Sequence, residues 1–164
     1  MLKLKNVLLS AFLIACLALL AGCQAPEPAA PAEPAAPDYA AEYCPMLDTV
    51  FEVWNSKDYP ALHAIMTDDF VRDAPDQNTQ GKEEHQAFME GIHATYPDFK
   101  IVSRERAYAE NLAFVHWIVT GTEAASGNAV EVSGISLMTI EGGKFTSEAV
   151  RFDMAALQAQ LAGE

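Results

Sequence analysis

Two side chains in the sequence have types that suit proton transfer. Asp153 follows a strand-like run, and in an apolar cavity its carboxylate could take a proton from an acidic carbon. His116 stands in an otherwise apolar run and could act as a general base. Asp153 also has a simpler role, because an Asp at a strand-to-helix junction is a good N-cap for a helix over 154–161. We favour the cap.

The neighbour of His116 decides what kind of pocket the sheet could form. His116 and Trp117 cannot both face a cavity, because successive side chains of a strand point to opposite faces. An inward His116 would make the pocket a reaction site, whereas an inward Trp117 would make it apolar and better suited to binding. We favour an inward Trp117. We expect Trp54 and Phe70 to belong to the core and to wall the same cavity.

Two charged residues could fix the orientation of a ligand. Arg151 shares a predicted strand face with Ser147 and Ala149, whose small side chains leave room for an anionic group beside the guanidinium. An exposed partner for the acidic surface is the simpler interpretation of Arg151, and we favour it. Asp73 could act as an acid opposite the strands, although we favour a plain loop residue.

The sequence has weak patterns for metals and cofactors. Glu90 and His93 have the i, i+3 spacing of carboxylate metal sites, but the pair occurs once and falls on the polar side of its predicted helix. There is no glycine-rich phosphate loop and no Gly-x-Ser-x-Gly turn. We therefore expect no metal site and no cofactor.

Hydrophobic spacing predicts the elements that would position these residues. Apolar residues recur at helical spacing over 39–56, where Pro45 is expected to break or restart the helix near its beginning. Asp58 should cap a second short helix, and a third is expected over 82–95 after a polar loop over 76–80. Strand-like runs cover 70–71, 99–108, 112–122, 130–140 and 144–152. This order predicts an α+β domain with helices packed on one face of a curved, mostly antiparallel sheet.

Length and charge limit the classes of protein. The chain has 164 residues, enough for one compact domain, and 23 acidic against 10 basic residues give a formal net charge of -13. Nucleic acid is excluded as a partner, because its phosphates require a basic surface. The three cysteines lack Cys-x-x-Cys spacing, which excludes a zinc ribbon and a disulfide-rich scaffold.

The N-terminus resembles a bacterial lipoprotein signal. Lys3 and Lys5 precede an apolar stretch over 7–20, which ends in Leu20-Ala21-Gly22-Cys23. The resemblance implies cleavage before Cys23 and a lipid on its thiol, so residues 1–22 are the signal peptide. Residues 23–38 are the lipidated cysteine and a Pro/Ala-rich tether, and 39–164 are the folded domain. Gln24 is typical of outer-membrane lipoproteins, which would place the domain on the periplasmic face in a Gram-negative host.

Several short fragments of the domain, in their order, resemble one family. They are Trp54-Asn55-Ser56-Lys57-Asp58, Asp68-Asp69-Phe70-Val71, Tyr96-Pro97-Asp98 and Gly142-Gly143-Lys144-Phe145. Over about 47–163 the chain looks like the SnoaL-like polyketide cyclase or ester cyclase family of the nuclear transport factor 2-like superfamily. The resemblance implies a cone-shaped domain with an apolar cavity and a homodimer formed through the sheet.

The sequence departs from that family at its chemical positions. Family members often carry Glu-x-Trp in the last strand, and alignment on the nearby glycines puts Ser147 and Ala149 there. Glu148 lies one place off, which predicts that its side chain points to the other face. Asp73 replaces a histidine common in the family, and Glu123 replaces another after Gly121-Thr122.

These features support three functional hypotheses. The first is a lipid-anchored cell-envelope protein that binds a small hydrophobic molecule in a cone-shaped pocket. The second is a cofactor-independent cyclase, isomerase or hydrolase in which Asp153 or His116 moves a proton. The third is an envelope adaptor that binds a protein partner through its exposed sheet.

Overall fold

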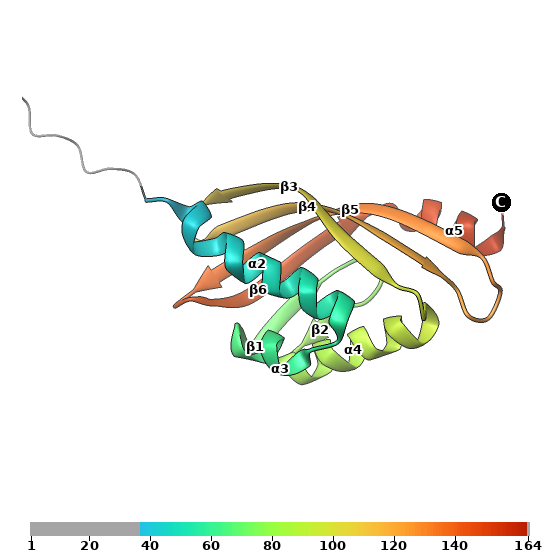
Figure 1. Ribbon diagram of the computed structural model, residues 1–164, viewed down its shortest axis with the longest axis horizontal. Coiled ribbons are helices and arrows are strands. Elements are labelled where there is room, and N and C mark those ends of the chain that lie inside the picture. Colours follow the sequence, from blue (N-terminus) through green and yellow to red (C-terminus); the bar gives the residue numbers. More distant parts are fainter. Residues whose placement is uncertain (1–36, 164) are drawn as a thin grey trace, which may run out of the picture. The chain divides into compact units, whose positions relative to one another are not determined.

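The computed structural model describes residues 37–163 (Figure 1). The predicted signal peptide, Cys23 and nearly all of the tether lie outside these residues. The elements follow the chain as α2 (Tyr39–Ser56), α3 (Tyr59–Ala64), β1 (Met66–Asp73), β2 (Thr79–Gln80), α4 (Lys82–Thr95), β3 (Lys100–Ala109), β4 (Leu112–Thr122), β5 (Ala129–Glu141), β6 (Lys144–Phe152) and α5 (Met154–Ala162). No helix among residues 37–163 is long and apolar enough to cross a membrane.

Helix α2 begins and ends with local capping devices. The Asp38 carboxylate accepts a hydrogen bond from the backbone N–H of Ala41, and Lys57 closes the helix in a left-handed conformation. The helix is continuous through Pro45, so the predicted break there is wrong. Proline removes one backbone hydrogen bond, and the buried apolar face that follows stabilises the helix against that loss.

The strands form one mixed sheet of six, in the order β2-β1-β6-β5-β4-β3. All neighbouring pairs are antiparallel except β1 and β6, which run parallel. The predicted short strand at 70–71 is longer, and the predicted loop over 76–80 ends in a two-residue edge strand whose Thr79 pairs with Arg72. The α+β architecture with a mostly antiparallel sheet is confirmed.

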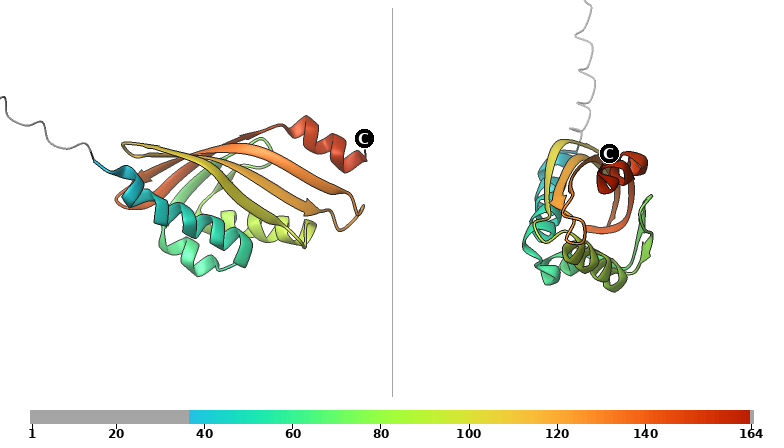
Figure 2. Two further views of the ribbon diagram at one scale, coloured as in Figure 1. Left: turned by 45° about the horizontal axis from the view of Figure 1, so that its top comes forward. Right: turned by 90° about the vertical axis from the view of Figure 1, so that its right-hand side faces the viewer.

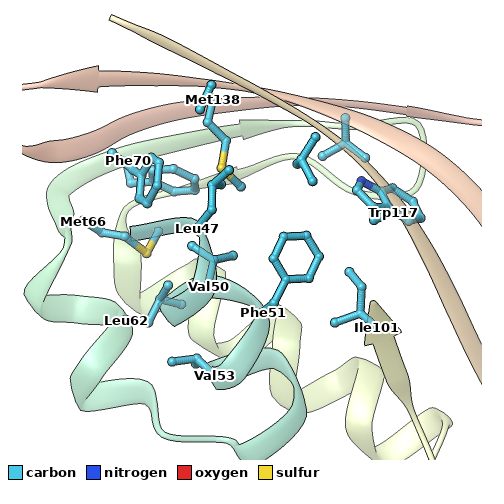
Figure 3. Close-up of a cluster of buried hydrophobic side chains, with 14 of the residues drawn as sticks. Leu47, Val50, Phe51, Val53, Leu62, Met66, Phe70, Ile101, Trp117 and Met138 are labelled. Atoms are coloured by element: carbon cyan, nitrogen blue, oxygen red, sulfur yellow. The ribbon is translucent and has the colours of Figure 1, made fainter. Parts of the chain in front are cut away.

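The helices give the sheet an inner and an outer face. In the two views of Figure 2, α2, α3 and α4 lie together on one side of the curved sheet, and α5 lies beside its far end. Side chains of α2, including Leu47, Val50 and Phe51, point toward Trp117 and Met138 on the inner face (Figure 3). This contact forms the buried core.

A β-bulge in β6 changes which side chains reach the inner face. Ile140 of β5 pairs with Phe145, but the next residue back, Thr139, pairs with Ser147. Thr146 is therefore an extra residue, and the inward alternation passes from Phe145 to Glu148. Thus Glu148, not Ser147, faces the helices.

Candidate functional site

A largely apolar cavity lies between the inner face of the sheet and helices α2 and α4. It has a volume of about 120 Å³, which is room for several water-sized molecules. Its apolar wall is formed by Val50, Phe51, Trp54, Phe88, Ile92, Tyr96, Phe99, Ile101, Val115, Trp117, Val119, Val130, Val132, Met138, Val150, Phe152 and Leu157. Four polar residues complete the lining: Arg72, Asp76, Ser136 and Glu148.

Arg72 is buried in the cavity wall, and its guanidinium group is bound by neighbouring residues. Its Nη1 lies 3.0 Å from Oδ1 of Asp76 and donates to the backbone oxygen of Gln77 at 2.5 Å. Its Nη2 donates to Oδ2 of Asp76 at 3.2 Å, and Cζ lies 4.3 Å from the centroid of the Phe88 ring. A paired, stacked guanidinium of this kind is held rigidly in place.

Of the two carboxyl groups in the cavity, Glu148 is paired more weakly with Arg72 than Asp76 is. Its side chain is only 11% exposed, and Oε2 lies 3.9 Å from Nε of Arg72, beyond hydrogen-bond distance. Burial raises the pKa of Glu148 above its ordinary value, while Arg72 and the Ser136 hydroxyl act in the opposite direction. A buried carboxyl group whose pKa is raised in this way is a candidate for holding a proton inside the cavity.

The predicted inward Trp117 lies in the cavity wall with its indole N–H bonded. Nε1 donates to Oγ of Ser136 at 3.0 Å, and Trp117 pairs with Gly134 across the β4–β5 ladder. A Cβ on Gly134 would lie 2.3 Å from two ring atoms of Trp117, so the ring occupies the space that a side chain would need.

The other two aromatic residues predicted in the pocket differ in position. Trp54 lines the cavity, where its ring lies 6.2 Å from that of Phe88. Phe70 is buried but outside the lining, with its ring 5.1 Å from the ring of His85. Phe70 thus belongs to the core under the cavity.

His116 lies on the outer face of the sheet and does not reach the cavity. Its Nδ1 is 2.5 Å from Oε2 of Glu105, and its Nε2 is 2.7 Å from Oγ of Ser133. The hydrogen bond from His116 lowers the pKa of Glu105. Strand alternation puts His116 opposite to Trp117, so the geometry gives no support to His116 as a base in this cavity.

Asp153 and the pair Arg151–Asp73 also lie outside the cavity lining. Oδ1 of Asp153 accepts a hydrogen bond from the N–H of Ala156 at 3.0 Å, which makes Asp153 the N-cap of α5. Nη2 of Arg151 lies 2.7 Å from Oδ2 of Asp73, and both side chains are more than half exposed. The bulge explains the position of Arg151, because it turns the odd-numbered residues after Thr146 outward.

Sequence reasoning missed the polar end of the cavity. The prediction that Glu148 points away from the pocket is wrong, since it assumed an unbroken alternation through β6. Arg72 was missed because it lies in the sequence between acidic residues, Asp69 and Asp73, where a surface position is the usual expectation. The one available signal was the spacing of Glu148 by two and four residues from Val150 and Phe152, in a strand that should face a core.

Two histidines of α4 are buried, which corrects the polar position predicted for His93. His93 is 7% exposed and its Nε2 has no hydrogen-bond partner, while burial lowers its pKa. His85 is 3% exposed, and burial, with Arg72 nearby, lowers its pKa from 6.5 to about 3. Glu90, which forms the i, i+3 pair with His93 in the sequence, is exposed. Within residues 37–163 no three His, Cys, Asp or Glu side chains gather in a metal-binding group.

Comparison with solved structures shows the same fold in several bacterial proteins. A candidate SnoaL-like polyketide cyclase from Jannaschia sp. CCS1 is 17% identical with a TM-score of 0.71, over 80% of this chain and 99% of that one. A candidate polyketide cyclase from Bacillus cereus ATCC 10987 is 16% identical with a TM-score of 0.68, over 78% and 85%. AclR, a candidate hydroxylase from Streptomyces galilaeus, is 18% identical with a TM-score of 0.65, over 76% and 98%.

These likenesses confirm the nuclear transport factor 2-like fold, and at such low identity they show the fold alone. A search of curated proteins finds no match. A family model, by contrast, matches the sequence itself. The model of the SnoaL-like domain covers residues 47–148, from α2 to the carboxyl group in the cavity. The chain therefore belongs to the SnoaL-like domain family.

Proposed function

We propose that this protein binds a small, mainly apolar molecule in the cavity between α2, α4 and the inner face of the sheet. The observation that carries the proposal is the cavity itself, an apolar and aromatic wall with polar groups at one end. Pockets of this composition bind a ligand through its apolar body and orient it through a few polar contacts. Trp54 and Trp117 supply rigid aromatic area, and Glu148 supplies a polar group.

A pair of substitutions on strand β5 tests the proposal. Val132 lines the cavity, while Ile135 lies on the outer face and is 58% exposed. Val132→Trp should fill the cavity and Ile135→Trp should leave it open, although both add bulk to the same strand. Native mass spectrometry of gently purified protein should show a retained small molecule in the wild type and in Ile135→Trp only.

Two results would count against a working pocket. Equal retention of the small molecule by Val132→Trp would show that it binds elsewhere. The second result is that no molecule is retained and a neutral naphthalene dye shows no saturable binding. The cavity would then bind no small apolar molecule, and the proposal would be wrong.

We further propose that the domain works at the cell envelope, held by a lipid on Cys23. The support is the sequence of the N-terminal segment, with its apolar stretch over 7–20, the Leu-Ala-Gly-Cys box and the tether. More than one acyl chain is needed for stable attachment, and a lipoprotein carries that number. In a Gram-negative host Gln24 favours the outer membrane, and the periplasmic face would hold the domain.

A second candidate function is proton transfer by Glu148, and its buried carboxyl group favours this candidate over Asp153 and His116. A carboxyl group with a raised pKa can take a proton from a carbon next to a carbonyl group and return it at another position. Such a reaction is a cofactor-independent isomerisation or cyclisation. Glu148→Gln keeps the shape of the side chain but cannot accept the proton.

The two candidate functions make different predictions for Glu148→Gln. A catalyst should lose turnover at least a hundredfold while the variant still retains ligand. A binding protein has no turnover to lose, and screens of the wild type against enolisable ketones and esters should then detect none.

A further inference from the structure

The polar end of the cavity has two carboxyl groups for one guanidinium. Asp76 holds the Arg72 guanidinium with contacts of 3.0 and 3.2 Å, so these two charges neutralise each other. The Glu148 carboxyl lies farther away, at 3.9 Å from Nε, and makes no hydrogen bond with Arg72. Burial alone favours the neutral form of Glu148, but a cation beside it favours the ionised form, and the three side chains then carry one negative charge in excess, on Glu148.

The positive charge of Arg72 is not free to meet an anionic ligand. Asp76 and the backbone oxygen of Gln77 occupy Nη1 and Nη2, and the guanidinium lies over the Phe88 ring. An anionic ligand would therefore meet the Glu148 carboxyl while both terminal nitrogens of the guanidinium are already paired. Desolvation of such a ligand beside a carboxylate would strongly disfavour binding.

The wall of the cavity suits an organic cation. Seven aromatic residues line it: Phe51, Trp54, Phe88, Tyr96, Phe99, Trp117 and Phe152. The faces of aromatic rings carry negative potential, and they attract ammonium and guanidinium groups within about 6 Å of their centroids. The contact between Arg72 and Phe88 is an example already present in this wall.

From this juxtaposition of an unbalanced carboxylate and an aromatic wall, we infer that the cavity takes an amphiphilic organic ammonium ion as its ligand. The inference rests on the proposed binding function and names its ligand class. The ammonium head lies toward Glu148, and the apolar body lies along Trp117 and Val132. The acidic surface of the protein, with its net charge of -13, raises the local concentration of such cations.

Three matched ligands test the inference on the full-length chain in a nonionic detergent. Benzyltrimethylammonium and neopentylbenzene have the same shape and differ in one positive charge, and phenylacetate supplies the negative charge. Their dissociation constants, corrected for partition into detergent micelles, come from quenching of tryptophan fluorescence. The ammonium ion should bind at least tenfold more tightly than neopentylbenzene, and phenylacetate should bind most weakly.

Two substitutions locate the charge that makes the difference. In Glu148→Gln the preference for the ammonium ion over neopentylbenzene should fall to about twofold or less, with binding of neopentylbenzene kept. Glu141→Gln removes one exposed carboxylate at the end of β5, outside the cavity lining, and should keep the full preference. The wild-type preference decides the ligand class even if Glu148→Gln fails to fold.

The outcomes separate this inference from the function on which it rests. Binding of neopentylbenzene as tight as that of the ammonium ion overturns the cationic class and leaves an apolar binding pocket in place. If Glu141→Gln loses the preference for the ammonium ion as fully as Glu148→Gln does, the preference comes from the general charge of the protein. That result overturns the role of Glu148. Binding of none of the three ligands overturns the inference and the proposed function together.

Discussion

Replacing Gly134 with alanine should destabilise the domain and displace the Trp117 ring. An ideal Cβ on Gly134 lies 2.3 Å from both Cζ2 and Cη2 of Trp117 and 3.0 Å from the backbone oxygen of Arg151. Neither neighbour can move freely. The indole N–H is bonded to Ser136, and the carbonyl group belongs to the adjacent strand β6. The new methyl group must push the ring out of its place.

The expected loss follows from three contributions. Overpacking of a dense core costs about 1–3 kcal/mol. Loss of the bond between Trp117 and Ser136 adds about 1 kcal/mol. Alanine offsets about 0.5–1 kcal/mol, because it has less backbone freedom than glycine in the unfolded chain. The free energy of unfolding should fall by about 2 kcal/mol, which lowers Tm by roughly 6–10 °C in a domain of this size.

Urea unfolding and near-ultraviolet circular dichroism measure both effects. Gly91→Ala is the matched control, because Gly91 lies in α4 with no atom within 4 Å of the position that the new methyl group would take. That variant should be more stable than the wild type by about 0.5–1 kcal/mol. If Gly134→Ala is as stable as Gly91→Ala and keeps the wild-type tryptophan spectrum, the Trp117 ring does not lie across Gly134 and this reasoning is refuted.

Four further predictions test other parts of the molecule. Burial lowers the pKa of His85 from 6.5 to about 3, so between these pH values the unfolded chain binds a proton that the folded chain does not bind. The free energy of unfolding should therefore fall by up to about 5 kcal/mol as the pH falls from 6.5 to 3. In urea titrations, the difference in the free energy of unfolding between the wild type and His85→Gln should shrink as the pH falls over that range. Asp153→Ala should lose about 1 kcal/mol of stability with the α5 cap and change ligand affinity less than twofold, as measured by urea unfolding and ligand titration. Cys23→Ser should stop the incorporation of labelled palmitate and leave the protein in the soluble fraction. If the chain forms the homodimer implied by its family resemblance, Ile135→Glu on the exposed face should yield monomer by native mass spectrometry.

The sequence predicted well those features that depend on local periodicity. Strands β4 and β6 have the predicted bounds because β-branched and aromatic residues fill them between clear turn residues. Alternation also required that only one of His116 and Trp117 face the cavity, and the structure buries the ring of Trp117, the one that we favoured, in the cavity wall. A period of two along an unbroken strand is a strong signal, since one face of the sheet must be apolar.

Features set by pairing between distant segments could not be predicted in the same way. Thr79 pairs with Arg72 only because the loop folds back on β1, and nothing in the local composition indicates that contact. His93 is buried because the ring of Phe99, from the segment after the helix, lies 5.2 Å away. A polar residue type on a helix favours an exposed position in any sequence-based prediction.

The bulge at Thr146 decides whether the cavity has a carboxyl group besides the one that is paired with Arg72. Without the extra residue, the alternation that places Phe145 inward would place Ser147 and Ala149 inward as well. Glu148 would then stand on the outer face, and Arg72 would keep Asp76 as its carboxylate partner. Bulges occur often beside functional sites, where they redirect a side chain. A buried carboxyl beside a guanidinium gives weak stabilisation, because burial offsets most of the attraction between the charges. The insertion thus adds little to the stability of the sheet, and its main effect is to bring Glu148 to an aromatic cavity.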